Sequence, residues 1–352
     1  MRFPASVWVR FALVLPLFAV VIALLVWRGP DWNLVADAFQ LVTWEWIAAA
    51  VLLNLVSVGF RALAWRAVIE QAMPPPLPAF RRVFSAFSVG LFANTVLPGR
   101  IGELARVAVL SRRVEGRRQA WATLAGTVFA HRVFDLVPTL LLIAYVLATS
   151  EIPHWALTSL ALFVAIAFGL FAFAFASARR HHRGMLAEAG QVRRLVTMAR
   201  HGLGVMHAPL PALGAILLQC LGWSMQLLAV YATMRGFQIE APLHAAAVVL
   251  LLMNVAMLFP LWPGNIGLVQ AAVALPLVSY GVAYPRGFAF GIGLQAIEMS
   301  VGIGIGLLFL AREGLSYAML KRMPGAEQAE VAEEGDAERE EEPARARAGV
   351  SG

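Results

Sequence analysis

Charged residues are scarce in this sequence. Asp, Glu, Lys and Arg make up 14% of its 352 residues, against about 25% in an ordinary soluble domain. Apolar residues make up 60%, and mean hydropathy is +0.73. A disordered chain needs the opposite balance, and a soluble globule would lack the charged residues to cover its surface. The sequence therefore predicts several helices buried in lipid.

Cysteine and the common catalytic motifs are also missing. Cys220 is the only cysteine, which excludes a disulfide within the chain and a thiolate metal cluster. The sequence contains no P-loop, no G-x-S-x-G and no H-E-x-x-H motif. His181 and His182 are adjacent, and neighbours in a helix do not face each other. We therefore expect no metal and no cofactor, and a transporter-like protein rather than an enzyme.

Lysine is nearly absent, because Lys321 is the only one and arginine carries the rest of the positive charge. Nine of the 21 acidic residues lie in 327–352, so residues 1–326 carry a net charge of +13. The acidic segment has no apolar face. These patterns predict a membrane domain at 1–322 and a disordered, solvated cytoplasmic tail at 323–352. Without a DNA- or RNA-reading motif, the basic balance indicates cytoplasmic loops rather than nucleic-acid binding.

Six apolar runs have the roughly 20 residues that a helix needs to cross a bilayer. The first is longer than the apolar region of a signal peptide and is interpreted as an uncleaved helix, with a signal peptide as the alternative. The six runs are Val7–Trp27, Trp44–Trp65, Trp121–Thr149, Trp155–Ser177, Leu210–Met234 and Gly287–Ala311.

Arginine placement predicts which loops face the cytoplasm. Basic residues cluster in 61–82, 100–118 and 179–200, and the positive-inside rule places such loops on the cytoplasmic side. The remaining loops hold few arginines. We therefore expect a multi-pass protein of the bacterial cytoplasmic (inner) membrane with both termini in the cytoplasm. The 185–207 part of the last basic cluster could form an amphipathic helix on an anionic leaflet or a solvated connector.

Two further apolar segments, Phe80–Leu97 and Ala245–Trp262, each end at a Pro-Gly pair. The first has basic residues at both ends and the second has few charges, so they are predicted to enter the membrane from opposite sides as re-entrant hairpins. The alternative is that both segments cross, which gives eight spans. The predicted breaks are Pro98, Gly99 and Gly102 in the first hairpin and Pro263, Gly264 and Gly267 in the second.

The predicted fold is thus all-α, with about six transmembrane helices plus two oppositely oriented re-entrant hairpins in an inverted repeat. Interrupted segments at matching places in two halves are typical of a transporter site. Broken backbone at membrane depth must be buried in protein or line a wet cavity.

Ionisable residues within predicted spans are candidates for function. Arg100, Glu103 and Arg106 follow the first break at helical spacing, and arginine suits phosphate. Asn94 precedes the break and could contact a ligand. The alternative is that these arginines are interfacial anchors.

A second group lies inside the third span, where Asp135 is spaced for an ion pair with Arg132 or His131. This group either packs helices or meets a lipid phosphate. Glu298, in the last span, needs a partner on another helix, with Arg61, Arg100 and Arg132 as candidates, or is protonated. We take Arg100, Glu103, Arg106, Arg132, Asp135, Glu298 and Asn94 as candidate substrate-binding residues.

The segment 94–106, NTVLPGRIGELAR, resembles the signature of the flippase-like membrane domain of lysylphosphatidylglycerol synthases and their stand-alone relatives. The segments 131–135, HRVFD, and 263–267, PGNIG, resemble two further motifs of that family, and the resemblance covers nearly all of residues 7–312. Gln270 stands where the family often has an acid. Only 41 residues follow Ala311 in this sequence, so we expect no soluble aminoacyl-transfer domain, and the resemblance implies lipid handling rather than lysine transfer.

Three functions compete at this point. The first is a translocase that moves a polar or anionic lipid between leaflets, with membrane lipids as its partners. The second is a membrane-embedded glycosyl or head-group transferase with Glu103 or Asp135 as base. The third is a non-catalytic accessory of lipid synthesis, including hopanoid pathways, with lipid-synthesis enzymes as partners.

Overall fold

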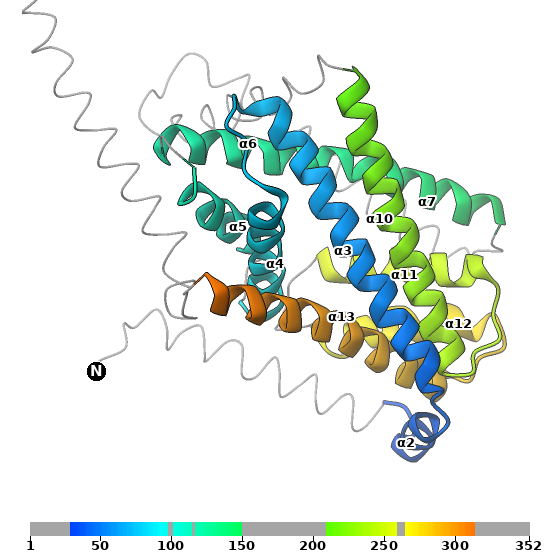
Figure 1. The fold of residues 1–352 in the computed structure, drawn as a ribbon. Coiled ribbons are helices and arrows are strands. Elements are labelled where there is room, and N and C mark those ends of the chain that lie inside the picture. The colour runs from blue at the N-terminus through cyan, green and yellow to red at the C-terminus, as the bar shows by residue number, and fades with distance from the viewer. Residues whose placement is uncertain (1–28, 98–100, 115–116, 150–208, 259–264, 314–352) are drawn as a thin grey trace, which may run out of the picture.

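The computed structural model describes residues 29–97, 101–114, 117–149, 209–258 and 265–313. Within these ranges the chain is helical and contains no strand. Figure 1 shows long helices crossing one another at several angles, with shorter helices packed between them. The all-α prediction is therefore confirmed for the described residues.

Within the described ranges, four helical stretches are long and apolar enough to span a membrane: Trp44–Ala72, Thr123–Thr149, Leu210–Gly236 and Tyr284–Arg312. They correspond to four of the six predicted spans. The other two, Val7–Trp27 and Trp155–Ser177, lie outside the described residues. The helices concerned are α3 (Trp44–Ala72), α6 (Arg117–Phe134), α7 (Leu136–Thr149), α10 (Pro209–Gly236) and α13 (Tyr284–Arg312).

The two segments with Pro-Gly breaks form pairs of shorter helices. The first pair is α4 (Phe80–Val96) and α5 (Gly102–Ser111), and the second is α11 (Leu243–Leu258) and α12 (Leu268–Val278). A helix of 10 or 11 residues is about 15 Å long, which is half of the roughly 30 Å hydrocarbon core. Pro98, Gly99, Arg100, Pro263 and Gly264 lie outside the described residues.

Each of these turns is tied by an asparagine side chain. Asn94 accepts a hydrogen bond from the Gly102 N–H at 2.9 Å, and Asn265 donates one to the Ala256 carbonyl at 2.8 Å. A Cβ at Gly102 would lie 2.0 Å from the Gly90 carbonyl oxygen, so the crossing of α4 and α5 requires glycine. Gly267 has a φ of 91°, a conformation that glycine adopts without a steric penalty.

The helix order of the first half recurs in the second. The starts of α3, α4, α5 and α6 precede those of α10, α11, α12 and α13 by 165, 163, 166 and 167 residues. The helices α3 and α10 lie against each other (Figure 1). Ser57 Oγ donates to the Gly222 carbonyl at 2.8 Å, across a separation of 165 residues. Thr43 N–H donates to the Gly236 carbonyl at 2.9 Å, so the start of α3 meets the end of α10 and the two run antiparallel.

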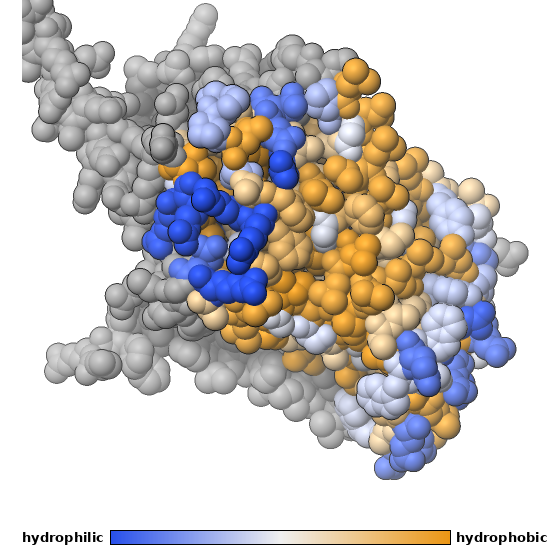
Figure 2. Space-filling model, in the orientation of Figure 1, coloured by the Kyte–Doolittle hydropathy of each residue, from blue (hydrophilic) through white to orange (hydrophobic). Residues whose placement is uncertain are grey.

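Two large apolar cores correspond roughly to the two halves. One joins α3, α4, α5 and the C-terminal part of α13, and includes Trp65 and Leu110. The other joins α7, α10, α11, α12 and the N-terminal part of α13, and includes Met234 and Phe290. α13 thus contributes to both cores and links them. Much of the outer surface of α3 and α10 is apolar (Figure 2), as lipid contact requires.

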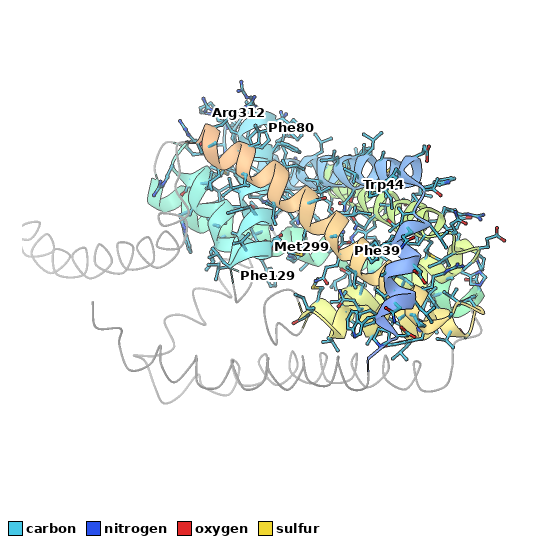
Figure 3. All side chains as sticks on the ribbon, turned by 90° about the horizontal axis from the view of Figure 1, so that it is seen from below. Phe39, Trp44, Phe80, Phe129, Met299 and Arg312 are labelled. Atoms are coloured by element: carbon cyan, nitrogen blue, oxygen red, sulfur yellow. The ribbon has the colours of Figure 1, made fainter. Side chains whose placement is uncertain are left out.

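A short helix, α2 (Trp32–Gln40), precedes α3. Its Asp31 N-cap accepts from the Asn33 N–H at 2.9 Å. Phe39 meets Phe237 edge-on at a centroid distance of 5.3 Å, so α2 packs beside the end of α10. Figure 3 shows Phe39 and Trp44 at this end of the molecule and Phe80 and Arg312 at the opposite end.

Candidate functional site

Glu103 connects the short helix α5 to the long helix α6. One carboxylate oxygen lies 2.5 Å from Arg106 Nη2, and the other accepts a hydrogen bond from Arg132. The sequence predicted Glu103 between two arginines on its own strip. In the structure Arg106 does lie beside Glu103, and the second arginine beside it is Arg132 of α6. Arg100 lies outside the described residues.

Arg106 is almost fully buried, with 4% of its side chain exposed. Its guanidinium carbon lies 4.7 Å from the centroid of the Trp65 ring and 5.3 Å from that of Phe87. The Trp65 indole N–H donates to Thr127 Oγ1 at 3.1 Å, which fixes the ring. The carboxylate and the two aromatic faces offset part of the cost of burying this cation. Arg106 therefore positions Glu103 from the protein interior.

Arg132 is the exposed member of the group, with 53% of its side chain accessible. Besides Glu103, it pairs with Asp135 at 3.2 Å, as the spacing of the two residues predicted. A guanidinium has five N–H donors, so donors remain for a further acceptor. This half-exposed position distinguishes Arg132 from the buried Arg106.

A stripe on α10 contacts the carboxylates of the neighbouring helices. Gln219 donates to Asp135 Oδ1 at 2.7 Å, and the Trp223 indole donates to the same oxygen at 3.1 Å. Gln226 donates to Glu298 Oε1 at 2.6 Å. The three donors are spaced i, i+4 and i+7 and so share one helix face. α10 thereby links Asp135 on the α6–α7 span to Glu298 on α13.

Arg61 of α3 completes this link. Its guanidinium carbon lies 5.2 Å from the Trp223 ring centroid, and its charge acts on both Asp135 and Glu298. Of the three predicted partners of Glu298, Arg61 is near enough for its charge to act on that carboxylate, and Arg100 lies outside the described residues. Arg132 is engaged with Glu103 and Asp135 instead.

His131 is buried between α3 and α6 rather than paired with Asp135. Its Nε2 lies 3.2 Å from the Arg61 carbonyl oxygen, and its ring meets Phe87 at a centroid distance of 6.1 Å. Within the described part of the chain, six buried side-chain polar atoms have no hydrogen-bond partner. They are Arg61 Nε, His131 Nδ1, Gln219 Oε1, Arg106 Nε and the two ion-paired atoms Arg106 Nη2 and Glu103 Oε2. The centre of the molecule therefore has unused hydrogen-bonding capacity.

The second turn has a different, uncharged chemistry. Gln270 accepts from the Gly267 N–H at 2.6 Å and donates to Gln295 Oε1 at 2.5 Å. Both glutamines are buried. Gln270 therefore connects the second turn to α13. It occupies the position where the family that the sequence resembles often has an acid.

The structure brings five predicted site residues into one group: Glu103, Arg106, Arg132 and Asp135 are linked by ion pairs, and Glu298 follows across α10. Asn94 instead closes the first turn through its bond to Gly102. We call the linked residues the charged cluster, with its members Arg61, Glu103, Arg106, Arg132, Asp135 and Glu298.

Sequence reasoning missed the groups that support this cluster. Trp65 and Phe87 lie within apolar runs of the sequence, where an aromatic residue usually has only a packing role. The i, i+4, i+7 stripe of Gln219, Trp223 and Gln226 was readable, because two amides on one face of an otherwise apolar span need a partner. Within the described residues, no group of three or more His, Cys, Asp or Glu side chains is placed to hold a metal ion.

Long apolar helices surround the charged cluster. This arrangement defines a multi-pass membrane protein with charged side chains between its helices. The family described as the lysylphosphatidylglycerol synthase TM region matches residues 7–306, and the chain belongs to this family. It is also similar to a UPF0104 membrane protein of Methanothermobacter thermautotrophicus, with 26% identity over 286 residues, 74% of this chain and 81% of that protein. No solved structure matches the chain.

Proposed function

We propose that this protein is a lipid translocase that moves a polar or anionic lipid between the leaflets of the bacterial inner membrane. The observation that supports this function best is the pair of ion pairs that Glu103 makes, one with Arg106 on the same short helix α5 and one with Arg132 on the neighbouring span. Charged residues at bilayer depth are costly and commonly mark a substrate path. Family membership points to lipid handling as well.

Two re-entrant hairpins would bring these ion-paired residues to the middle of the bilayer. The pairs α4–α5 and α11–α12 each place a limb of 17 or 16 residues before a limb of 10 or 11 residues. The first limb is about 25 Å long and the second about half of the roughly 30 Å hydrocarbon core. The antiparallel contact of α3 with α10 implies that the two halves have opposite orientations. We therefore infer an inverted repeat, with one hairpin entering from the cytoplasm and the other from outside.

The head group would bind at Arg132. Its side chain is half exposed, so an anionic oxygen can reach the guanidinium, with which phosphate forms strong paired hydrogen bonds. Arriving phosphate would compete with Glu103 and Asp135 for the same donors. Glu103 would stay paired with buried Arg106, and Asp135 would keep the hydrogen bonds from Gln219 and Trp223. The cluster can therefore release Arg132 while both carboxylates keep a partner.

The rest of the path would run along α10. Asp135, Arg61 and Glu298 follow one another across this helix through Gln219, Trp223 and Gln226. Arg61 Nε and Gln219 Oε1, which are buried without a hydrogen-bond partner, could donate and accept a hydrogen bond with a passing head group. The acyl chains would remain against the apolar outer surface. The chain has no nucleotide-binding motif, so movement would be driven by a gradient or be energy-independent.

A liposome assay with three proteins tests this function. The purified protein is reconstituted with a fluorescent anionic lipid, and an impermeant quencher reports the fraction reached from outside. We expect the wild-type protein to bring inner-leaflet lipid within reach of the quencher. We expect Arg132→Gln to slow this lipid movement by about tenfold, which corresponds to about 1.4 kcal/mol on its activation barrier. Arg66→Gln is the matched control, since Arg66 pairs with Glu70 on the same helix as Arg61 but outside the cluster.

Equal rates for Arg132→Gln and wild type would contradict the proposed head-group site. A wild-type rate equal to that of empty liposomes would contradict translocation. Mass spectrometry of the same liposomes detects the competing chemistry: a new lipid species, formed from an added donor, would indicate a transferase instead.

A further inference from the structure

Five exposed arginines gather at one end of the molecule, and we call them the basic patch. They come from the first turn of α4, the end of α5 and the end of α13. Figure 2 shows the most hydrophilic colour of this face where α5 and α13 end. The members of the basic patch are Arg81, Arg82, Arg112, Arg113 and Arg312.

Specific contacts hold the three helix ends together. Phe84 of α4 meets Phe309 of α13 edge-on at a centroid distance of 5.4 Å. Glu313, at the end of α13, accepts from Ser85 Oγ at 2.8 Å and from Arg113 Nη2 at 2.9 Å. The arginines therefore share one surface because their helices are packed and hydrogen-bonded at this end, not because of chance proximity.

The basic patch keeps a positive excess. Glu313 pairs with Arg113, and its own side chain is only 15% exposed. Arg112 has an interaction of its own, so the positive excess comes from Arg81, Arg82 and Arg312. Five arginines at the ends of three helices repel one another unless a negative partner is present. The surface thus fits an acidic partner.

We propose that the acidic segment of this same chain, residues 327–342, docks on the basic patch. The segment contains nine acids and a single arginine, Arg339. The described residues end at Glu313, which itself lies on the basic patch, so the segment begins 14 residues further along the chain. Fourteen residues extend to at most about 50 Å, which is ample to reach the patch, and a short tether gives an effective concentration in the mM range.

Docking would be electrostatic rather than apolar. The segment 327–342 has no large apolar residue except Val331, so carboxylate–guanidinium contacts would supply the binding. Such contacts weaken as the Debye length falls from about 10 Å at 0.1 M salt to about 3 Å at 1 M. The docked segment would shield the end of α5, the short limb that carries Glu103 at its other end.

Spin-label distances in the full chain test this proposal. In a Cys220→Ala background, labels at Ala79→Cys and Ala337→Cys report the distance from the exposed start of α4 to the acidic segment, in nanodiscs of zwitterionic lipid. We expect a narrow distance distribution that broadens at 1 M salt. The matched control places the first label at Ser279→Cys, an exposed position at the end of α12, where we expect a broad distribution throughout.

Charge variants identify the contact. Changing the nine acids of 327–342 to glutamine, or Arg81 and Arg82 to glutamate, should broaden the distribution, whereas Arg235→Glu at the distant end of α10 should not. Identical distributions for the native and the glutamine segment would overturn the proposal. If the Arg81/Arg82 change then weakens binding of anionic-lipid vesicles instead, the basic patch is a lipid-headgroup surface.

Discussion

Ser57 of α3 hydrogen-bonds to the carbonyl of Gly222 of α10, the residue 165 positions further along the chain. The same interval separates the starts of α3 and α10. Two matching residues in contact on antiparallel helices mark the place where a two-fold axis relating the halves would pass. The charged cluster lies beside this place, because a Cβ on Gly222 would lie 3.0 Å from Arg61 Cγ.

A larger side chain at Gly222 should therefore disturb function through Arg61. We expect Gly222→Leu to displace the Arg61 side chain and to slow lipid movement by about tenfold. Gly214→Leu is the control on the same helix, where an added Cβ meets nothing within 4 Å. The liposome assay measures both, and equal rates for the two variants would show that Arg61 is not needed.

Removing the charge of Glu103 should destabilise the protein. In Glu103→Gln, buried Arg106 loses its carboxylate, and breaking a buried ion pair by removing one partner costs about 3–5 kcal/mol. Thermal unfolding in detergent measures the loss. The double variant Glu103→Gln/Arg106→Gln removes the unpaired charge and should recover part of it. A double variant less stable than the single one would mean that Arg106 stabilises the fold mainly through Trp65 and Phe87.

Glu298→Gln should separate folding from transport. The substituted amide oxygen can still accept the hydrogen bond from Gln226, so thermal unfolding should change little. The charge opposite Arg61 is lost, and the rate of lipid movement should fall by about tenfold. Unchanged movement with unchanged stability would remove Glu298 from the path.

The first turn should tolerate no side chain at Gly102. In Gly102→Ala the Cβ would lie 2.0 Å from the Gly90 carbonyl oxygen and 2.6 Å from Asn94, so α5 must separate from α4. We expect little folded protein in the membrane fraction. Gly304→Ala on α13, where a Cβ meets nothing within 4 Å, should fold normally. Equal yields would contradict the close crossing.

Apolar length predicted four spans, 44–65, 121–149, 210–234 and 287–311, where the structure has helical stretches at 44–72, 123–149, 210–236 and 284–312. The first helix continues seven residues beyond its predicted end, through Arg66 and Glu70, because a helix need not stop where its apolar run does. Helical spacing predicted that Asp135 pairs with Arg132 or His131, and the structure has the pair with Arg132. The pairing of Glu103 with Arg132 did not, since 29 residues separate them and only the packing of α5 on α6 brings them together.

The role of Asn94 shows the same limit. A polar residue before a break suits both a ligand contact and a turn, and sequence cannot distinguish them. The structure places its carbonyl oxygen on the Gly102 N–H. The sequence thus predicted which polar residues lie within the membrane helices, while the tertiary packing determines what each of them contacts.

The account depends on two hairpins that enter the membrane from opposite faces, and side-specific cysteine labelling tests this most directly. In the Cys220→Ala background, Arg113→Cys lies just beyond α5 and Ser279→Cys just beyond α12, and both positions are exposed. We predict that an impermeant reagent labels Arg113→Cys only from the cytoplasm and Ser279→Cys only from outside. Labelling of Arg113→Cys from outside, or of both positions from one face, would contradict the account.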